Sequence, residues 1–148
     1  MNLRRATYAD RRVLYGLATD PTMRLARGTD RIFTWAEHCQ WLKKVLGASN
    51  VHLFIAEDGN KIVGEIRFDV DGEQAEVGLV VNKRGRGQGY GTEMIVEGMK
   101  LVGCEKFTAR IDPENVASRK CLKRAGFSRV GGEYSIHWIK TEAPDENI

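Results

Sequence analysis

Two turn signals within a run of alternating apolar residues constrain the fold of this chain most strongly. The segments HLFIAE (52–57) and KIVGEIRFDV (61–70) flank Asp58-Gly59-Asn60, and AEVGLVV (75–81) follows Asp71-Gly72. Apolar residues at every second position are typical of strands, and Asp-Gly pairs between such runs are typical of tight hairpin turns. Residues 52–81 are therefore predicted to form three antiparallel strands in sequence order.

The apolar pattern on either side of these strands predicts the remaining elements. Before them we expect a strand at 2–7, a helix from Thr7 to about Thr19 and a helix at 34–46; after them, helices at 90–103 and 115–126 and strands at 106–111 and 134–141. Hairpins in the first half and strand-loop-helix units in the second predict an α/β (α+β) fold. We expect a mixed, mainly antiparallel sheet of six or seven strands with helices on both faces.

Composition bounds the class of protein. A chain of 148 residues with 42% hydrophobic residues fits one domain, expected at 1–141, followed by a polar and flexible tail at 142–148. The net charge of +3 does not favour a nucleic-acid partner. No apolar run is long enough for a membrane span or a secretory signal, so we expect a cytoplasmic protein. Cys39, Cys104 and Cys121 lack the spacing of a disulfide framework or a metal site, and no metal is expected.

Four glycines at alternate positions mark the junction between the third predicted strand and the next helix: Gly85, Gly87, Gly89 and Gly91. Their spacing fits neither the dinucleotide fingerprint GxGxxG nor a P-loop. Backbone N–H groups at the start of a helix can bind an anion, and Lys83, Arg84 and Arg86 add positive charge. The pattern predicts a phosphate or pyrophosphate site; the alternative is a flexible surface loop with solvated basic residues.

Two motifs in this region carry a family resemblance. RGQGYG (86–91) resembles the R/Q-x-x-G-x-G/A motif of the GNAT superfamily of acetyl-CoA-dependent N-acetyltransferases. ENVASRKCLKRAGF (114–127) resembles that family's downstream N-x-x-A/S segment ending in Gly-Phe, with Asn115, Ser118, Gly126 and Phe127 in register. The resemblance extends over about residues 1–140. It implies a splayed central pair of strands, with the pantetheine arm of the coenzyme in the gap.

The resemblance also implies which residues bind acetyl-CoA, the expected co-substrate. They are Leu79, Val80, Val81, Arg84, Arg86, Gly87, Gln88, Gly89, Tyr90, Gly91, Thr92, Asn115 and Ser118. Main-chain N–H groups from Arg86 to Thr92 would hold the pyrophosphate, which explains the need for glycine. Asn115 is also placed to cap the helix that follows it.

Acetyl transfer to an amine requires a proton acceptor, because an alkyl ammonium has no free lone pair. The resemblance favours Glu76 as this base, with Glu65 and His38 as rivals; each carboxylate could instead be a solvated strand residue. Many relatives carry a tyrosine that protonates the leaving thiolate, but Leu122 occupies that position here. Cys121, Tyr90, Tyr134 or water remain as alternatives for the acid.

A second resemblance concerns the acceptor. Residues 20–46, IRFD (66–69) and AEVGLVV (75–81) resemble enzymes that acetylate the 4-amino group of a UDP-linked deoxy amino sugar in the pathway to pseudaminic acid. This implies a small-molecule amine as substrate, with an amino sugar on a nucleotide as the leading candidate. Its expected binding residues are Arg24, Trp41 and Arg67. The alternatives are core tryptophans with surface arginines, an acetyltransferase for protein N-termini or polyamines, or a non-catalytic acetyl-CoA-binding module. Dimers are common in the family, so the resemblance is compatible with a homodimer.

Overall fold

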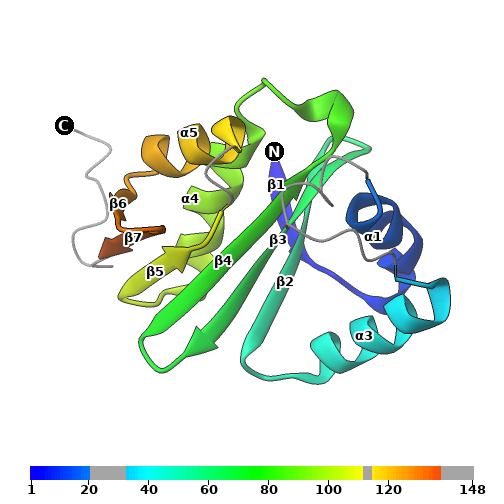
Figure 1. The fold of residues 1–148 in the computed structure, drawn as a ribbon. Helices are drawn as coiled ribbons and strands as arrows, with labels where there is room; N and C mark the ends of the chain where they lie inside the picture. The colour runs from blue at the N-terminus through cyan, green and yellow to red at the C-terminus, as the bar shows by residue number, and fades with distance from the viewer. Residues whose placement is uncertain (21–32, 112–114, 138–148) are drawn as a thin grey trace.

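The computed structural model describes residues 1–20, 33–111 and 115–137. Within them, seven strands form one sheet in the order β1-β2-β3-β4-β5-β7-β6 (Figure 1). The strands are β1 (Asn2–Arg5), β2 (Val51–Asp58), β3 (Lys61–Asp71), β4 (Gln74–Val81), β5 (Lys106–Ala109), β6 (Ser128–Val130) and β7 (Glu133–His137). Only the β4–β5 pair is parallel among the described strands. The expected mixed, mainly antiparallel sheet is confirmed.

Helices cover both faces of the sheet, as expected. The described helices are α1 (Arg11–Ala18), α3 (Trp35–Gly47), α4 (Tyr90–Val102) and α5 (Val116–Arg124), with 3-10 turns η1 (Tyr8–Asp10) and η2 (Lys83–Gly85). Figure 1 shows α1 and α3 beside β2 on one face, and α4 and α5 on the other. No helix among the described residues is both long and apolar enough to cross a membrane.

The predicted turns and caps account for most element boundaries. Gly59 and Gly72 adopt φ of 61° and 63°, which a side chain would disfavour, and each closes a hairpin. Thr34 caps α3, since the Glu37 N–H donates to Thr34 Oγ1 at 3.1 Å. Gly103, at φ 74°, ends α4 in the left-handed conformation.

Several predicted elements differ from the structure. Strands β1 and β5 end at Arg5 and Ala109, two residues before the predicted ends at 7 and 111. The helix predicted from Thr7 begins as the 3-10 turn η1, and α1 starts only at Arg11. The Asp10 carboxylate accepts from the Thr7 N–H at 2.7 Å and from both terminal nitrogens of Arg4, which anchors this turn to β1. Strand β6 was not predicted as a separate element, because its three residues are all exposed and show no apolar alternation.

Alternation along β3 sorts its side chains between the two faces of the sheet. Ile66 and Phe68 are fully buried in the core that includes Met94 of α4. A second core on the other face joins Leu14 and Leu42, from α1 and α3, to β2. Residues 65 and 67 of β3 therefore point toward the α1 and α3 side, where the pocket described below opens.

Candidate active site

Strands β4 and β5 pair over only part of their length. Their parallel pairing ends at Glu76↔Thr108, whereas β4 continues to Val81 and stays paired with β3 as far as Gly64↔Val81. The two strands therefore diverge beyond Glu76, which is the splayed pair that the family resemblance implies. Gly64 allows β3 and β4 to approach closely here, since a Cβ at that position would lie 2.2 Å from the Val80 carbonyl oxygen.

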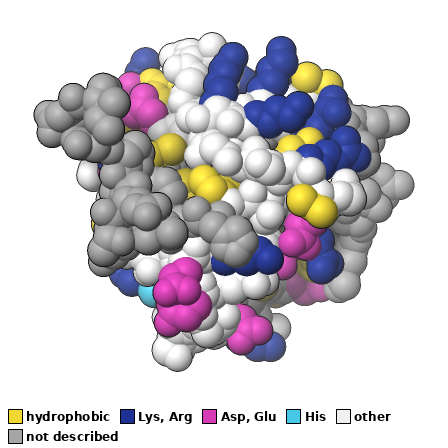
Figure 2. Space-filling model, turned by 90° about the vertical axis from the view of Figure 1, so that its left-hand side faces the viewer, with side chains coloured by type: hydrophobic (Ala, Val, Ile, Leu, Met, Phe, Trp, Pro, Cys, Tyr) yellow, Lys and Arg dark blue, Asp and Glu magenta, His cyan; other side chains and the backbone are white. Residues whose placement is uncertain are grey.

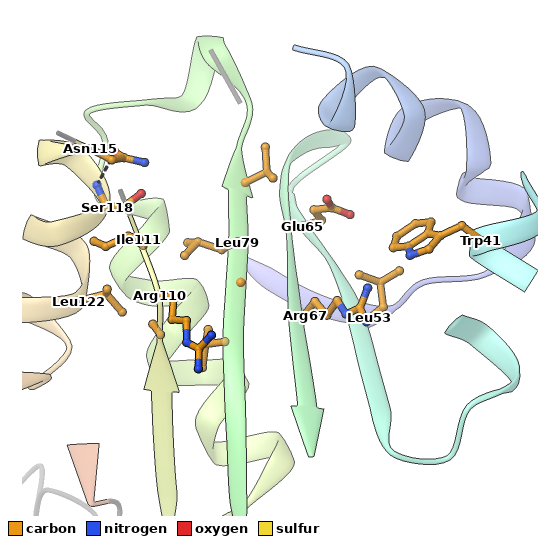
Figure 3. Close-up of a pocket in the computed structure, with 14 residues that line it drawn as sticks. Trp41, Leu53, Glu65, Arg67, Leu79, Arg110, Ile111, Asn115, Ser118 and Leu122 are labelled. Atoms are coloured by element: carbon orange, nitrogen blue, oxygen red, sulfur yellow. Dashed lines mark hydrogen bonds between the residues drawn. The ribbon is translucent and has the colours of Figure 1, made fainter. Parts of the chain in front are cut away.

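A pocket of about 210 Å³ opens where the strands diverge (Figure 3). It runs from α5 past β4 to the side of α3. Its lining is Trp41, Leu53, Glu65, Arg67, Val77, Gly78, Leu79, Val80, Ala109, Arg110, Ile111, Asn115, Ser118 and Leu122. Seven of the predicted site residues are thus brought together: Trp41, Glu65, Arg67, Leu79, Val80, Asn115 and Ser118.

The α5 end of the pocket is formed by a helix start. Asn115 caps α5, and its Oδ1 accepts from the Ser118 N–H at 3.1 Å (Figure 3). The Leu122 side chain, fully buried, lines the same end. The predicted N-cap role of Asn115 is confirmed, and the residue that replaces the family's tyrosine lies on the pocket wall.

The glycine-rich segment turns the chain from β4 into α4. Gly87 and Gly89 have φ of 79° and 84°, and Gly89 occupies the N-cap of α4, where no side chain caps the helix. The other two glycines provide space: a Cβ on Gly91 would lie 2.7 Å from Cys121 Sγ, and one on Gly85 3.3 Å from the Tyr90 ring. Two glycines therefore set the backbone path, and two allow close packing.

Side chains of this loop mostly brace it. Arg86 Nε donates to the Val81 carbonyl at 3.1 Å, and its Nη2 lies 3.3 Å from Asp20 Oδ2. Gln88 Nε2 donates to the Arg84 carbonyl at 3.0 Å. The loop is therefore held at the end of β4 and tied to the end of α1, and the first turn of α4 offers main-chain N–H groups that no side chain caps.

Positive charge accumulates on α5. The helix contains Arg119, Lys120, Lys123 and Arg124 and no acidic residue. Figure 2 shows Lys and Arg side chains gathered toward the top of the face drawn there. Together with Lys83, Arg84 and Arg86 of the loop, these residues favour an anionic ligand over a cationic one at this end of the site.

The opposite end of the pocket combines an acid, a cation and an indole. Glu65 is 8% exposed and stands opposite Val80 in the β3–β4 register. Arg67 Nε donates to Asp69 Oδ1 at 2.6 Å, and the Arg67 guanidinium lies 5.7 Å from the centre of the Trp41 ring. Figure 3 shows Glu65, Arg67 and Trp41 on the other side of β4 from Asn115 and Ser118.

The two other candidate bases, Glu76 and His38, lie outside the described lining of the pocket. Glu76 is exposed on β4 opposite Asp69, outside the pocket lining. His38 is 5% exposed and its Nε2–H donates to the Arg11 carbonyl at 3.0 Å; burial lowers the pKa of His38, which keeps its ring neutral. Arg24 lies outside the described residues.

The alternatives for the acid are also placed. The Tyr90 hydroxyl donates to Asp58, and Cys121 packs against Gly91. Tyr134 is 2% exposed, and its hydroxyl has no hydrogen-bond partner among the described residues. None of the three belongs to the described lining of the pocket.

Sequence reasoning missed Arg110 and Ile111, which follow β5 and line the pocket. Both fall within the strand predicted at 106–111, and no sequence pattern shows that β4 stops pairing with β5 before them. Thr92, predicted to bind the coenzyme, lies in the first turn of α4; its buried hydroxyl has no partner among the described residues. The described residues contain no cluster that could hold a metal ion.

The comparison with protein families places this fold and site in a class. Residues 1–128 match the family model for the acetyltransferase (GNAT) domain, and the chain belongs to that family. No curated protein sequence matches the chain. The family resemblance drawn from the two motifs is thus confirmed, whereas the pseudaminic-acid branch has no such support.

Solved structures share the fold. AAC(6')-Ib in complex with ribostamycin and coenzyme A superposes with a TM-score of 0.84 at 20% identity, covering 99% of this chain and 98% of that one. Spermidine N-acetyltransferase from Vibrio cholerae, in complex with CoA and spermine, gives 0.83 at 12% identity and 96% coverage of both chains. A domain from Methanocaldococcus jannaschii gives 0.76 at 20% identity, covering 93% of this chain and 97% of that one.

Proposed function

We propose that this protein transfers an acetyl group from acetyl-CoA to a primary amine. The observation that carries the proposal is the end of β4–β5 pairing at Glu76↔Thr108, directly beside a pocket with a helix start at one end and a buried carboxylate at the other. A thioester entering from the α5 side would meet an amine from the α3 side. The GNAT structures in complex with coenzyme A share this fold.

The residues present fit acetyl-CoA. The uncapped start of α4 suits a pyrophosphate, because its N–H groups and the helix dipole both favour an anion. Beyond Glu76, β4 pairs with β3 but not with β5, which leaves main-chain groups on its β5 side for the amides of the pantetheine arm. Leu79 and Val80 of this stretch lie on the pocket wall. Asn115 and Ser118 would face that arm from α5. When bound, acetyl-CoA supplies the thioester carbonyl that the amine attacks.

Glu65 is the proton acceptor that the pocket favours. Its carboxylate lies on the pocket wall at 8% exposure, next to the strand along which the thioester would lie. Glu65 would take a proton from the bound ammonium, directly or through water, and thereby free the lone pair. Leu122 offers no proton to the departing thiolate, so solvent or water in the pocket would supply it. Glu76 and His38 remain the alternatives for the base.

An amino sugar carried on a nucleotide is the leading acceptor. Trp41 offers a half-exposed indole on which a sugar ring could stack, and Arg67 beside it suits an anionic group. Complexes of the aminoglycoside acetyltransferase AAC(6')-Ib with ribostamycin and with kanamycin support the sugar part of this acceptor. The alternative is a polyamine or peptide amine, since the V. cholerae relative acts on spermidine.

A thiol-release assay with acetyl-CoA tests the reaction and its acceptor together. The panel contains UDP-linked amino sugars, aminoglycosides, polyamines and peptides with free N-termini. We expect turnover of UDP-linked amino sugars above the others. Turnover of a peptide alone would transfer the assignment to protein acetylation. Firm acetyl-CoA binding without turnover of any amine would favour a sensor.

Matched variants separate the two carboxylates. Glu65→Gln should lower kcat/KM by about 10²-fold or more, chiefly at low pH, where the amine is most protonated and most needs a base. Glu76→Gln, on the same face of the sheet but outside the pocket lining, should change kcat/KM by less than about 3-fold. The reverse pattern would make Glu76 the base.

A further inference from the structure

The loop between β4 and α4 is fastened to the β2–β3 hairpin at its first residue. The Asn82 N–H donates to the Val63 carbonyl at 2.7 Å, and Asn82 Nδ2 donates to the Ile62 carbonyl at 3.4 Å. The side-chain oxygen of Asn82 accepts from the Arg84 N–H at 3.0 Å. The end of β4 and the start of the loop are thus held by one asparagine.

A second fastening lies at the far end of the same loop. Tyr90 is the first residue of α4, and its hydroxyl donates to the carboxylate of Asp58 at the tip of the β2–β3 hairpin. This hydrogen bond raises the pKa of Tyr90, as expected for a phenol that donates to a carboxylate. The Tyr90 ring also packs against the backbone of Gly85, 3.3 Å from the position of a Cβ there.

The segment between Asn82 and Tyr90 loses much conformational entropy when it becomes ordered. Gly87 and Gly89 have positive φ, and glycine is the residue with the most backbone freedom to lose on ordering. A ligand that must order such a segment binds more weakly than one that meets it already ordered. A contact that orders the segment beforehand therefore strengthens binding without touching the ligand.

We propose that Tyr90 and Asp58 are positioning residues, which pre-order the main-chain N–H groups at the start of α4 for the pyrophosphate of the coenzyme. The inference rests on the proposed function, since it concerns the same co-substrate. In this proposal the Tyr90 hydroxyl orders the loop by its hydrogen bond to Asp58 and does not donate a proton to the thiolate. It also makes the hairpin tip, 32 residues earlier in the chain, part of the coenzyme site.

Calorimetric titration of the full chain with two ligands tests this role. The ligands are acetyl-CoA and adenosine 3′-phosphate 5′-diphosphate, the nucleotide fragment that keeps two phosphates at its 5′ position but lacks the pantetheine arm. Tyr90→Phe and Asp58→Asn should each raise Kd by about 3- to 10-fold, and by the same factor for both ligands. The double variant should bind no more weakly than either single variant. Tyr8→Phe, a control in η1, should bind both as wild type does.

Two results would overturn the proposal, and a third would overturn the proposed function instead. Unchanged Kd values in both single variants would overturn the proposal, because other contacts would then suffice to order the loop. Weaker binding of acetyl-CoA with unchanged binding of the nucleotide fragment would also overturn it, since the effect would lie at the thioester end. If wild-type protein binds neither ligand, the proposed function itself fails. Thermal melting of each variant within about 2 °C of wild type excludes general unfolding as the cause.

Discussion

Replacing Gly64 by alanine tests the close approach of β3 and β4 that accompanies the divergence of β4 from β5. The new Cβ would lie 2.2 Å from the Val80 carbonyl oxygen, about 1 Å inside ordinary contact. The obstacle is backbone, so no side-chain rotation relieves it. Gly64 is buried and pairs with Val81 in a central strand, so the strands themselves must move.

The expected cost follows from that movement. Overpacking a buried site costs about 1–3 kcal/mol, and a backbone obstacle places Gly64→Ala in the upper part of that range. For a chain of this size, we expect the melting temperature to fall by roughly 4–12 °C. Because Val80 lines the pocket, acetyl-CoA should also bind more weakly.

Gly78→Ala is the matched control for this prediction. Gly78 lies on β4, and a Cβ there meets nothing within 4 Å. Differential scanning calorimetry should find Gly78→Ala as stable as wild type or slightly more so. A Gly64→Ala protein that melts with wild type, or a Gly78→Ala protein that melts as low as Gly64→Ala, would refute the reasoning.

Three further outcomes follow from other contacts. Hydrogen bonds from Arg4 lower the pKa of the Asp10 carboxyl. The ionised Asp10 therefore stabilises the fold fully above its unfolded-state pKa of about 4, and this stabilisation is lost as the pH falls through the folded-state pKa. Asp10→Asn should therefore destabilise by roughly 1–2 kcal/mol at pH 7, and thermal melts should show this difference shrinking toward pH 3. Gly91→Ala should lower the melting temperature, and adding Cys121→Ala should restore most of the loss, because the clash is with that sulfur at 2.7 Å; failure of the rescue would contradict a packing role. Trp41→Ala should raise the acceptor KM by about 10-fold while leaving the Kd of acetyl-CoA unchanged in calorimetry.

Local signals in the sequence were sufficient for most of the fold. Gly59 and Gly72 mark hairpins because each turn needs a positive φ, and Thr34 marks a helix start because its hydroxyl caps the N–H of Glu37. β6 escaped prediction because a three-residue exposed strand has no apolar pattern to detect. Its partner β7 follows after the two-residue turn Gly131-Gly132, and this Gly-Gly hairpin signal was overlooked.

The residues of the candidate site also divide into those with a local sequence signal and those without one. Asn115 and the loop glycines were recognisable from the sequence because capping and positive φ are local requirements. Whether Glu65 or Glu76 reaches the pocket was not, since both stand on strands and share a face of the sheet. That choice depends on where pairing between β4 and β5 stops, which is at Glu76↔Thr108, and no local pattern in the sequence marks this point.

Binding of acetyl-CoA to the purified chain tests the central claim most directly. Isothermal titration should give one site per chain for acetyl-CoA, with ATP binding far more weakly because it has no pantetheine arm to enter the gap beside β4. Gly89→Val should weaken acetyl-CoA binding strongly, because a β-branched residue resists the φ of 84° at the start of α4. Tight binding of ATP with no heat from acetyl-CoA would contradict the account.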